Sequence, residues 1–330
     1  MTMRRLLLIL AVGGLGFSEL ASAGPETVIS GYAVVHDWPQ LPQGRTLGSA
    51  AGVGVTRGGT VLVFHRATRS WSEPLPLDPI AAPTIAEFDI GSGKLVREWG
   101  AGIFAMPHGL TTDSQDNVWL TDVALHQVFK FSRDGKLLLT VGERGVPGTD
   151  GAHFNRPTDV AVLPDGSFYV SDGYRNTRVV KFTSDGRFDF QWGESGTGPG
   201  QFDTPHAVTL DAEGRVYVAD RENDRVQVFT PRGQFIAQWK SAAIGRPYSV
   251  AMLGTAFALI ADGGEQPDGP PERSGVSVVS RAGAPLQRLG RWGNYDGQFM
   301  MAHDAAGDAD GNFYVVDIAG RRVQKFALGR

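Results

Sequence analysis

The sequence predicts an all-β protein, a six-bladed β-propeller whose blades are four-stranded sheets. Two observations carry this prediction. Short apolar strands alternate with turn residues from about residue 30 to residue 330, and no stretch sustains the apolar period of a long helix. One pattern of strands and turns also returns six times at a spacing of roughly 40 to 55 residues, as propeller blades do, because each small sheet buries its faces against its neighbours.

The second copy shows the repeat unit most clearly. Its expected strands begin at Pro107 and cover 118–122, 127–131 and 137–141. In five copies, the residue that follows a Pro, or that follows Ala302, is followed 14 positions later by an Asp. These five pairs are His108 and Asp122, Thr158 and Asp172, His206 and Asp220, Tyr248 and Asp262, and His303 and Asp317. We predict that the sixth copy starts at Gly52, where the same offset reaches Arg66 instead of Asp.

The chain order predicts how the ring closes. The last copy supplies only three strands before the chain ends at Arg330. Residues 31–38 have the pattern of the outer strands that end near Trp99 and Trp192, so we expect them to complete the last blade and leave no free sheet edge. The prediction is one propeller domain over residues 24–330, and a monomer, because a closed ring needs no subunit contact to cover its edges.

Residues 1–23 are predicted to be a signal peptide. Arg4 and Arg5 precede an apolar stretch over residues 6–17, and Ala-Ser-Ala at 21–23 forms a small-residue cleavage site. About 12 apolar residues are too few to span a bilayer, which takes about 20, and no other uncharged run approaches that length. We therefore expect an exported protein without a membrane span, either periplasmic or secreted.

Composition limits the partners and the chemistry. The formal net charge is −4 and no lysine-rich run is present, which argues against nucleic acid or an anionic membrane surface as a partner. The chain has no Cys, so it forms no disulfide, and a metal site must use His, carboxylate or backbone oxygen.

Three histidines share one position of the repeat. The first strand of each blade lines the axial channel, and His108, His206 and His303 start the first strands of copies two, four and six. Alternate blades of a six-fold ring lie about 120° apart, so these imidazoles are expected to converge on the axis. A single such histidine is more often a polar residue at a channel mouth, but three in alternating copies favour a metal site with an open fourth position, typical of catalytic zinc. The other histidines lack this phase and are interpreted as structural: His36, His65, His126 and His153.

The recurring Asp is expected to form hydrogen bonds or ion pairs within its blade, often with a following arginine (Arg178, Arg225 or Arg322). Arg66 breaks this pattern, and the sequence leaves two interpretations open. Arg66 is either a channel cation that binds an anion, or it forms a salt bridge with another partner within the first blade. Tyr174 and Arg221 follow the Asp of copies three and four, so both are expected near the channel rim.

Six segments carry a family resemblance: residues 64–66, 107–110, 117–131, 170–174, 219–223 and 301–304. In the same order, they resemble the lyase core of the peptidylglycine α-amidating enzymes, and the resemblance runs from about residue 30 to the C-terminus. That family folds as a six-bladed propeller and splits a peptidyl-α-hydroxyglycine into a peptide amide and glyoxylate.

The resemblance implies a set of site residues. His108, His206 and His303 would hold a catalytic zinc, with Tyr174, Arg66 and Arg221 as the other active-site groups. Tyr174 is the expected base, and the arginines are expected to clamp the substrate carboxylate or stabilise developing charge. Met301 would line the substrate pocket. A structural calcium would be bound by the carbonyls of Val53 and Leu110 and the carboxylate of Asp304.

The chain departs from the family at several points. Arg175 replaces a Cys beside the Tyr, Ala302 replaces a Pro before the third His, and no copper-monooxygenase region makes the hydroxyglycine. The substrate is therefore expected to be a peptidyl or N-acyl α-hydroxyglycine, or another carbinolamide. Two alternatives stay open at this point: a non-catalytic propeller of the NHL-repeat type that binds a partner, and a metal-dependent propeller lactonase.

Overall fold

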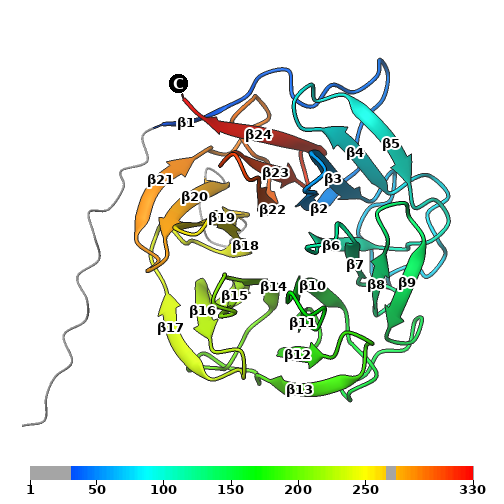
Figure 1. The fold of residues 1–330 in the computed structure, drawn as a ribbon, viewed down its shortest axis with the longest axis vertical. Coiled ribbons are helices and arrows are strands. Elements are labelled where there is room, and N and C mark those ends of the chain that lie inside the picture. Colours follow the sequence, from blue (N-terminus) through cyan, green and yellow to red (C-terminus); the bar gives the residue numbers. More distant parts are fainter. Residues whose placement is uncertain (1–30, 265–272, 330) are drawn as a thin grey trace, which may run out of the picture.

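The computed structural model describes residues 31–264 and 273–329, which form a ring of six blades around a central axis (Figure 1). Each blade is a four-stranded antiparallel sheet, so the predicted all-β propeller is confirmed. The predicted signal peptide, residues 1–23, lies outside the described residues. A short 3-10 helix, η1 (Arg221–Asn223), follows β15.

The strands run from the axis outward in each blade. Blade one contains β2 (Ala50–Val55), β3 (Thr60–His65), β4 (Ile85–Asp89) and β5 (Leu95–Trp99), and blade two contains β6 (Pro107–Thr112), β7 (Val118–Asp122), β8 (Gln127–Phe131) and β9 (Leu137–Val141). Blade three contains β10 (Pro157–Val162), β11 (Phe168–Asp172), β12 (Arg178–Phe182) and β13 (Phe188–Trp192), and blade four contains β14 (Pro205–Leu210), β15 (Val216–Asp220), β16 (Arg225–Phe229) and β17 (Phe235–Trp239). Blade five contains β18 (Pro247–Leu253), β19 (Phe257–Asp262), β20 (Gly275–Ser280) and β21 (Pro285–Leu289), and blade six contains β22 (Ala302–Gly307), β23 (Phe313–Asp317), β24 (Arg322–Leu328) and β1 (Tyr32–Val34).

Burial explains the apolar pattern of the strands. The second strand of each blade lies between two neighbouring blades, and every residue of β7, β11, β15 and β23 is buried. Such strands read as short continuous apolar runs. The outer strands, such as β9 and β13, are largely exposed although they keep apolar residues, for example Leu137 and Phe188.

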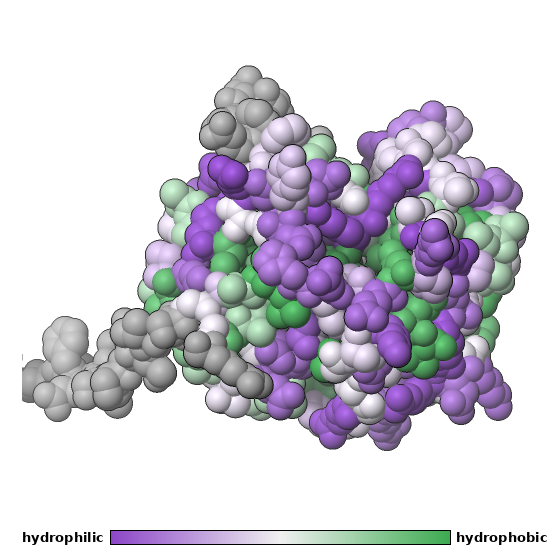
Figure 2. All heavy atoms as spheres, turned by 90° about the horizontal axis from the view of Figure 1, so that it is seen from above, coloured by the Kyte–Doolittle hydropathy of each residue, from purple (hydrophilic) through white to green (hydrophobic). Residues whose placement is uncertain are grey.

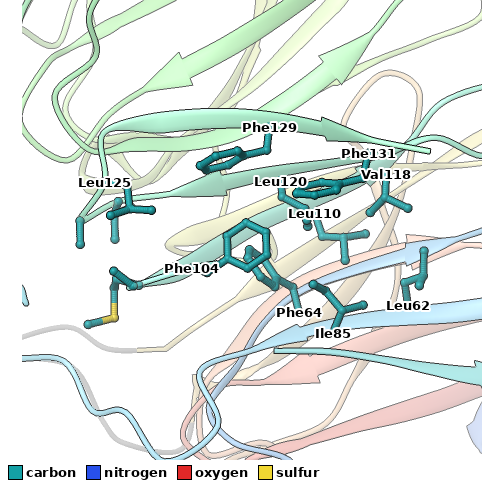
Figure 3. Packing of buried hydrophobic residues seen from close by; sticks show 14 residues of the cluster. Leu62, Phe64, Ile85, Phe104, Leu110, Val118, Leu120, Leu125, Phe129 and Phe131 are labelled. Carbon is teal, nitrogen blue, oxygen red and sulfur yellow. The ribbon is translucent and has the colours of Figure 1, made fainter. Parts of the chain in front are cut away.

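The core consists of apolar clusters between adjacent blades. Figure 3 shows the cluster between blades one and two, where Phe104 lies between Phe64 and Phe129. The ring centroid of Phe104 is 4.8 Å from that of Phe64 and 5.4 Å from that of Phe129, both in edge-to-face geometry. Aromatic pairs favour this arrangement, and the cluster fixes the angle between the two blades.

The N-terminal strand closes the ring as predicted. β1 pairs antiparallel with β24, with Tyr32 opposite Leu328, and Figure 1 shows it at the outer edge of blade six. The strand covers only 32–34 of the predicted 31–38. Tyr32 anchors it, because its ring packs against Phe313 and its hydroxyl donates a hydrogen bond to the Gly311 carbonyl oxygen (2.7 Å).

Every first strand shows a register shift near its start. Pro107 pairs with Asp122, Pro157 with Asp172 and Pro205 with Asp220, and the pairing then slips at the next residue. A bulge of this kind leaves one residue unpaired and redirects its side chain. The residue so placed, which we name the ring position, is Ala51, His108, Thr158, His206, Tyr248 or His303 in blades one to six.

The pairing corrects the predicted alignment of blade one. Ala50 pairs with His65, so the copy starts at Ala51 and not at Gly52. His65 therefore occupies the position of the repeat Asp, and Arg66 occupies the next position, which is that of Arg221 in blade four. The error arose because blade one has no Pro to mark its start.

The side of the rim that Figure 2 shows is mainly hydrophilic, with apolar patches between the polar residues. None of the described residues belongs to a helix with the length and apolar character needed to cross a membrane.

Candidate metal centre and substrate cavity

The three predicted histidines meet on the axis. The ring centroids of His108, His206 and His303 are 4.7, 4.9 and 5.0 Å apart, a nearly equilateral triangle. All three side chains are buried, and one nitrogen of each lies within 4.8 Å of the others. The repeat phase of the sequence therefore predicted this cluster correctly.

Backbone carbonyls fix the orientation of each imidazole. The Nδ1 atoms of His108, His206 and His303 donate hydrogen bonds to the carbonyl oxygens of Thr158 (2.7 Å), Tyr248 (2.6 Å) and Ala51 (2.7 Å), respectively. Each acceptor is the ring-position residue of the next blade, whose carbonyl the bulge leaves outside the ladder. Because a carbonyl only accepts, each Nδ1 carries the proton and each Nε2 keeps its lone pair.

The histidines are neutral. Burial lowers the pKa of His108 and His206 well below the usual value of histidine, and it lowers the pKa of His303 to about 3. The Tyr174 hydroxyl lies 3.0 Å from Nε2 of both His108 and His206. One hydroxyl proton cannot be donated to two nitrogens, so at least one buried lone pair is left for a cation. Three neutral imidazoles oriented in this way fit a zinc ion.

A glycine brings Tyr174 to the histidines. Gly173 follows the repeat Asp of blade three, and a Cβ at this residue would lie 1.9 Å from the Pro205 carbonyl oxygen in blade four. Only glycine permits this close approach of the two backbones. It carries the Tyr174 ring to 5.2 Å from that of His108 and 5.4 Å from that of His206.

Arg66 is a buried cation beside the cluster. Its side chain is 4% exposed, and its Nε donates a hydrogen bond to the Pro107 carbonyl oxygen (3.0 Å). Among the described residues, no carboxylate lies within salt-bridge distance of Arg66, so the alternative of a salt bridge within blade one is not observed there, and Asp122 acts on Arg66 only through its electrostatic field. A buried guanidinium without a directly bonded carboxylate favours the binding of an anion, because an unpaired buried charge is costly.

Arg221 faces the same space from blade four. Its guanidinium lies over the ring of Tyr174 (5.3 Å) and over that of Tyr248 (4.8 Å). Unlike Arg66, it has a carboxylate partner, because Glu222 accepts from its Nε (2.9 Å) and also pairs with Arg246. The two arginines occupy the same repeat position, but only Arg221 forms a salt bridge with a carboxylate among the described residues.

A cavity of about 530 Å³ opens above the cluster. The predicted site residues Arg66, Tyr174, Arg221 and Met301 all line it, together with His303. Its size is within the range of cavities that hold small ligands.

The residues predicted for calcium lie on the other side of the histidines. Val53, Leu110 and Asp304 line a second cavity of about 230 Å³, together with Asp159. Asp304 accepts hydrogen bonds from the amides of Val53 (2.9 Å) and Ala305 (2.8 Å). Burial raises the pKa of the Asp304 carboxyl to about 7. The carboxylates of Asp304 and Asp159 are oxygen ligands of the kind that a hard cation such as calcium prefers.

The repeat Asp has the predicted structural role. Arg178 donates from Nε to Asp172 (2.9 Å) and Arg225 to Asp220 (2.7 Å), and Arg322 lies 3.4 Å from Asp317. In blade one, His65 replaces this acid as an acceptor, because its Nδ1 accepts from the Ala67 amide (3.1 Å). Burial lowers the pKa of His65 to about 4, so the imidazole is neutral and adds no positive charge next to Arg66.

Sequence reasoning missed several cavity residues. Tyr248 stands at the ring position of blade five and was identifiable from the repeat, since it precedes Asp262 by the common offset. Its ring packs against His206 and His303. Trp71 and Arg246 also line the cavity, but they lie outside the repeat pattern and gave no signal.

Comparison with known proteins first defines the class. Residues 104–131, 154–182 and 202–229 match the NHL repeat family, and these segments fall in blades two, three and four. Among solved structures, a streptogramin B lyase superposes with a TM-score of 0.60 at 13% identity, covering 92% of this chain and 100% of that chain, which shows a shared fold alone. The chain is thus an NHL-repeat propeller with a three-histidine centre.

Its relatives define the family. Peptidyl-α-hydroxyglycine α-amidating lyase 1 of Drosophila melanogaster is 36% identical over 327 residues, covering 89% of this chain and 59% of the relative. Lyase 2 of the same organism is 31% identical over 332 residues, covering 92% of this chain and 77% of the relative. The peptidylglycine α-amidating monooxygenase of Rattus norvegicus is 36% identical over 315 residues, but the chain spans only 31% of its length. The chain belongs to the family of peptidyl-α-hydroxyglycine α-amidating lyases, which confirms the resemblance of the sequence motifs.

Proposed function

We propose that this protein is a zinc-dependent lyase that cleaves the C–N bond of a peptidyl- or N-acyl-α-hydroxyglycine, giving an amide and glyoxylate. The observation that carries the proposal is the open face of the three neutral histidines, with Tyr174 in hydrogen-bond distance of two of them. Family membership supports the reaction, since the relatives are named for it.

The chemistry needs a base, an anion site and a Lewis acid. In the reaction the substrate hydroxyl loses its proton, a C=O bond forms, the C–N bond breaks, and the leaving nitrogen takes a proton. Tyr174 is the proposed base, because it lines the cavity and its hydroxyl lies 3.0 Å from Nε2 of both His108 and His206. Zinc held by His108, His206 and His303 would supply Lewis acidity towards a substrate oxygen.

The two arginines are proposed to have different roles towards the negative charge of the substrate. Arg66 forms no salt bridge with a carboxylate among the described residues, so its planar guanidinium is the proposed clamp for the substrate carboxylate. Arg221 is proposed to support it by stabilising negative charge near Tyr174. Met301 forms part of the wall.

The proposed activity is tested by the release of glyoxylate from N-acyl-α-hydroxyglycines. Purified protein should release glyoxylate far faster than the uncatalysed reaction, and Arg66→Lys should raise KM, because an ammonium cannot bind a carboxylate through two parallel hydrogen bonds. A rate equal to the uncatalysed one over a panel of acyl groups, with zinc bound, would favour the non-catalytic NHL-repeat propeller instead.

Two further assignments belong to the same proposal. Calcium is the proposed occupant of the site near Val53, Leu110 and Asp304, where it would tie blades one, two and six together. We also propose that the protein is exported, as residues 1–23 indicate, and acts as a monomer.

A further inference from the structure

A long connection of blade one contributes to the wall of the cavity. The segment between β3 and β4, residues 66–84, which we name the strap, is longer than the corresponding connections of blades two, three, four and six (123–126, 173–177, 221–224 and 318–321). The strap contributes Arg66, Ser70 and Trp71 to the wall of the 530 Å³ cavity. An extended loop above a rigid scaffold is a common carrier of specificity.

One ion pair and one hydrogen bond connect the strap to the neighbouring part of the chain. Glu73 accepts two parallel hydrogen bonds from Arg156, at 2.7 and 2.8 Å. Arg144 donates a hydrogen bond to the Leu77 carbonyl oxygen (2.7 Å), and Arg69 pairs with Asp78 within the strap (2.6 Å). These contacts lie on both sides of Trp71 and connect the strap to the structure around it.

Trp71 presents its indole to the cavity directly above the active groups. Its ring centroid lies 5.3 Å from that of Tyr174, and the Arg66 guanidinium lies 5.3 Å from the indole centroid. The side chain nevertheless remains 38% exposed. A large aromatic surface left open inside a cavity gains free energy when an apolar group covers it.

The charged and the apolar residues occupy different parts of the cavity wall. Arg66 and Arg221 lie near Tyr174, whereas Trp71, Met301 and Ile318 provide apolar wall. A hydroxyglycine that contacts Arg66 and Tyr174 lies within reach of the indole, because both residues touch Trp71. The one substituent that these contacts leave over is the acyl group on the nitrogen.

We propose that Trp71 determines acyl specificity by packing against the N-acyl group of the substrate, and that the site prefers an aromatic or large apolar acyl group to a small one. The inference rests on the proposed lyase function for the identity of the reacting end. The acyl contact itself is a property of the cavity and can be measured without turnover.

The experiment compares two probes that differ only in the acyl group, N-benzoyl-α-hydroxyglycine and N-acetyl-α-hydroxyglycine. The wild type should favour the benzoyl substrate in kcat/KM. Trp71→Ala should lower kcat/KM for the benzoyl substrate by about 2- to 12-fold, the factor that matches an aromatic contact of about 0.5–1.5 kcal/mol. The acetyl substrate should change less than about 2-fold, and Trp71→Phe should keep most of the preference, because phenyl retains an aromatic face.

Two controls separate specificity from structure and from the chemistry. Trp292→Ala removes another exposed tryptophan, which lines a different cavity, and should leave kcat/KM unchanged for both substrates. Binding of the unreactive analogues N-benzoylglycine and N-acetylglycine, measured by calorimetry, repeats the comparison without turnover. A benzoyl preference in binding that Trp71→Ala removes, without glyoxylate release by the wild type, would keep this inference and reject the lyase function.

Two results would overturn the inference. If Trp71→Ala lowers kcat/KM equally for both acyl groups, the indole only supports Tyr174 and Arg66. If the wild type binds and turns over the benzoyl and acetyl compounds equally well, or binds neither, the indole does not contact the acyl group.

Discussion

Tyr174→Phe is the substitution that most sharply separates the proposed base from the scaffold. It removes one oxygen atom, which lies 3.0 Å from Nε2 of His108 and 3.0 Å from Nε2 of His206. The ring keeps its contacts with Trp71 and Arg221, so the cavity wall stays in place. Loss of a hydrogen bond costs about 0.5–1.5 kcal/mol of stability, which a folded domain tolerates.

The effect on catalysis should be much larger than the effect on stability. A positioned acid or base contributes about 10²- to 10⁴-fold to the rate, or about 3 to 5 kcal/mol of activation free energy. We therefore expect kcat for N-benzoyl-α-hydroxyglycine to fall at least about 100-fold while zinc content stays the same. KM should change little, because the arginines that hold the carboxylate remain.

The assay measures glyoxylate release over a range of substrate concentrations, with zinc content and the urea unfolding curve recorded for each variant. Tyr169→Phe is the matched control, because it also removes a buried tyrosine hydroxyl, one that donates to the Pro231 carbonyl oxygen and takes no part in the cavity. The control should lose stability but keep kcat. Turnover by Tyr174→Phe within a few-fold of the wild type would refute the role of Tyr174 as the base.

Three further predictions test the fold around the site. Gly173→Ala should lower kcat and destabilise the protein by about 1–3 kcal/mol, because its Cβ would lie 1.9 Å from the Pro205 carbonyl oxygen. A variant as active and as stable as the wild type would show that the backbone can move to accommodate the Cβ. Tyr32→Ala should cost about 3 kcal/mol in urea unfolding, since it removes the buried anchor of β1; unchanged stability would contradict closure by this strand. His65 has a pKa of about 4 in the folded protein and about 6.5 in the unfolded chain, so the unfolded chain binds the extra proton and the free energy of unfolding falls as pH drops from about 6.5 to 4. In His65→Asn this decrease in the free energy of unfolding should be smaller by up to about 3 kcal/mol. The same pH dependence in the variant and the wild type would contradict this prediction.

The sequence predicted those features that repeat. The phase of His108, His206 and His303 was visible because the offset from a Pro to an Asp recurs in five copies, and blade geometry turns an equal phase into a shared axial layer. The same argument predicted the Asp–Arg pairs in blades three and four. Periodicity is thus sufficient for the scaffold and for residues tied to it.

Features without a repeat phase could not be predicted in this way. Blade one has neither the Pro nor the Asp, so the alignment slipped by one residue and hid the equivalence of Arg66 and Arg221. Trp71 reaches the cavity only because the strap folds back over blade two and is held by Arg156. Such a contact depends on tertiary packing of a loop, which local sequence pattern does not encode.

A zinc titration tests the central claim most directly. Protein washed with chelator should lose glyoxylate release from N-benzoyl-α-hydroxyglycine, and added zinc should restore it in proportion, with saturation at about one zinc ion per chain. His206→Ala should show neither zinc binding at this level nor activity. Full activity in metal-free protein, or full zinc occupancy and activity in His206→Ala, would contradict the assignment of the three-histidine layer as the catalytic centre.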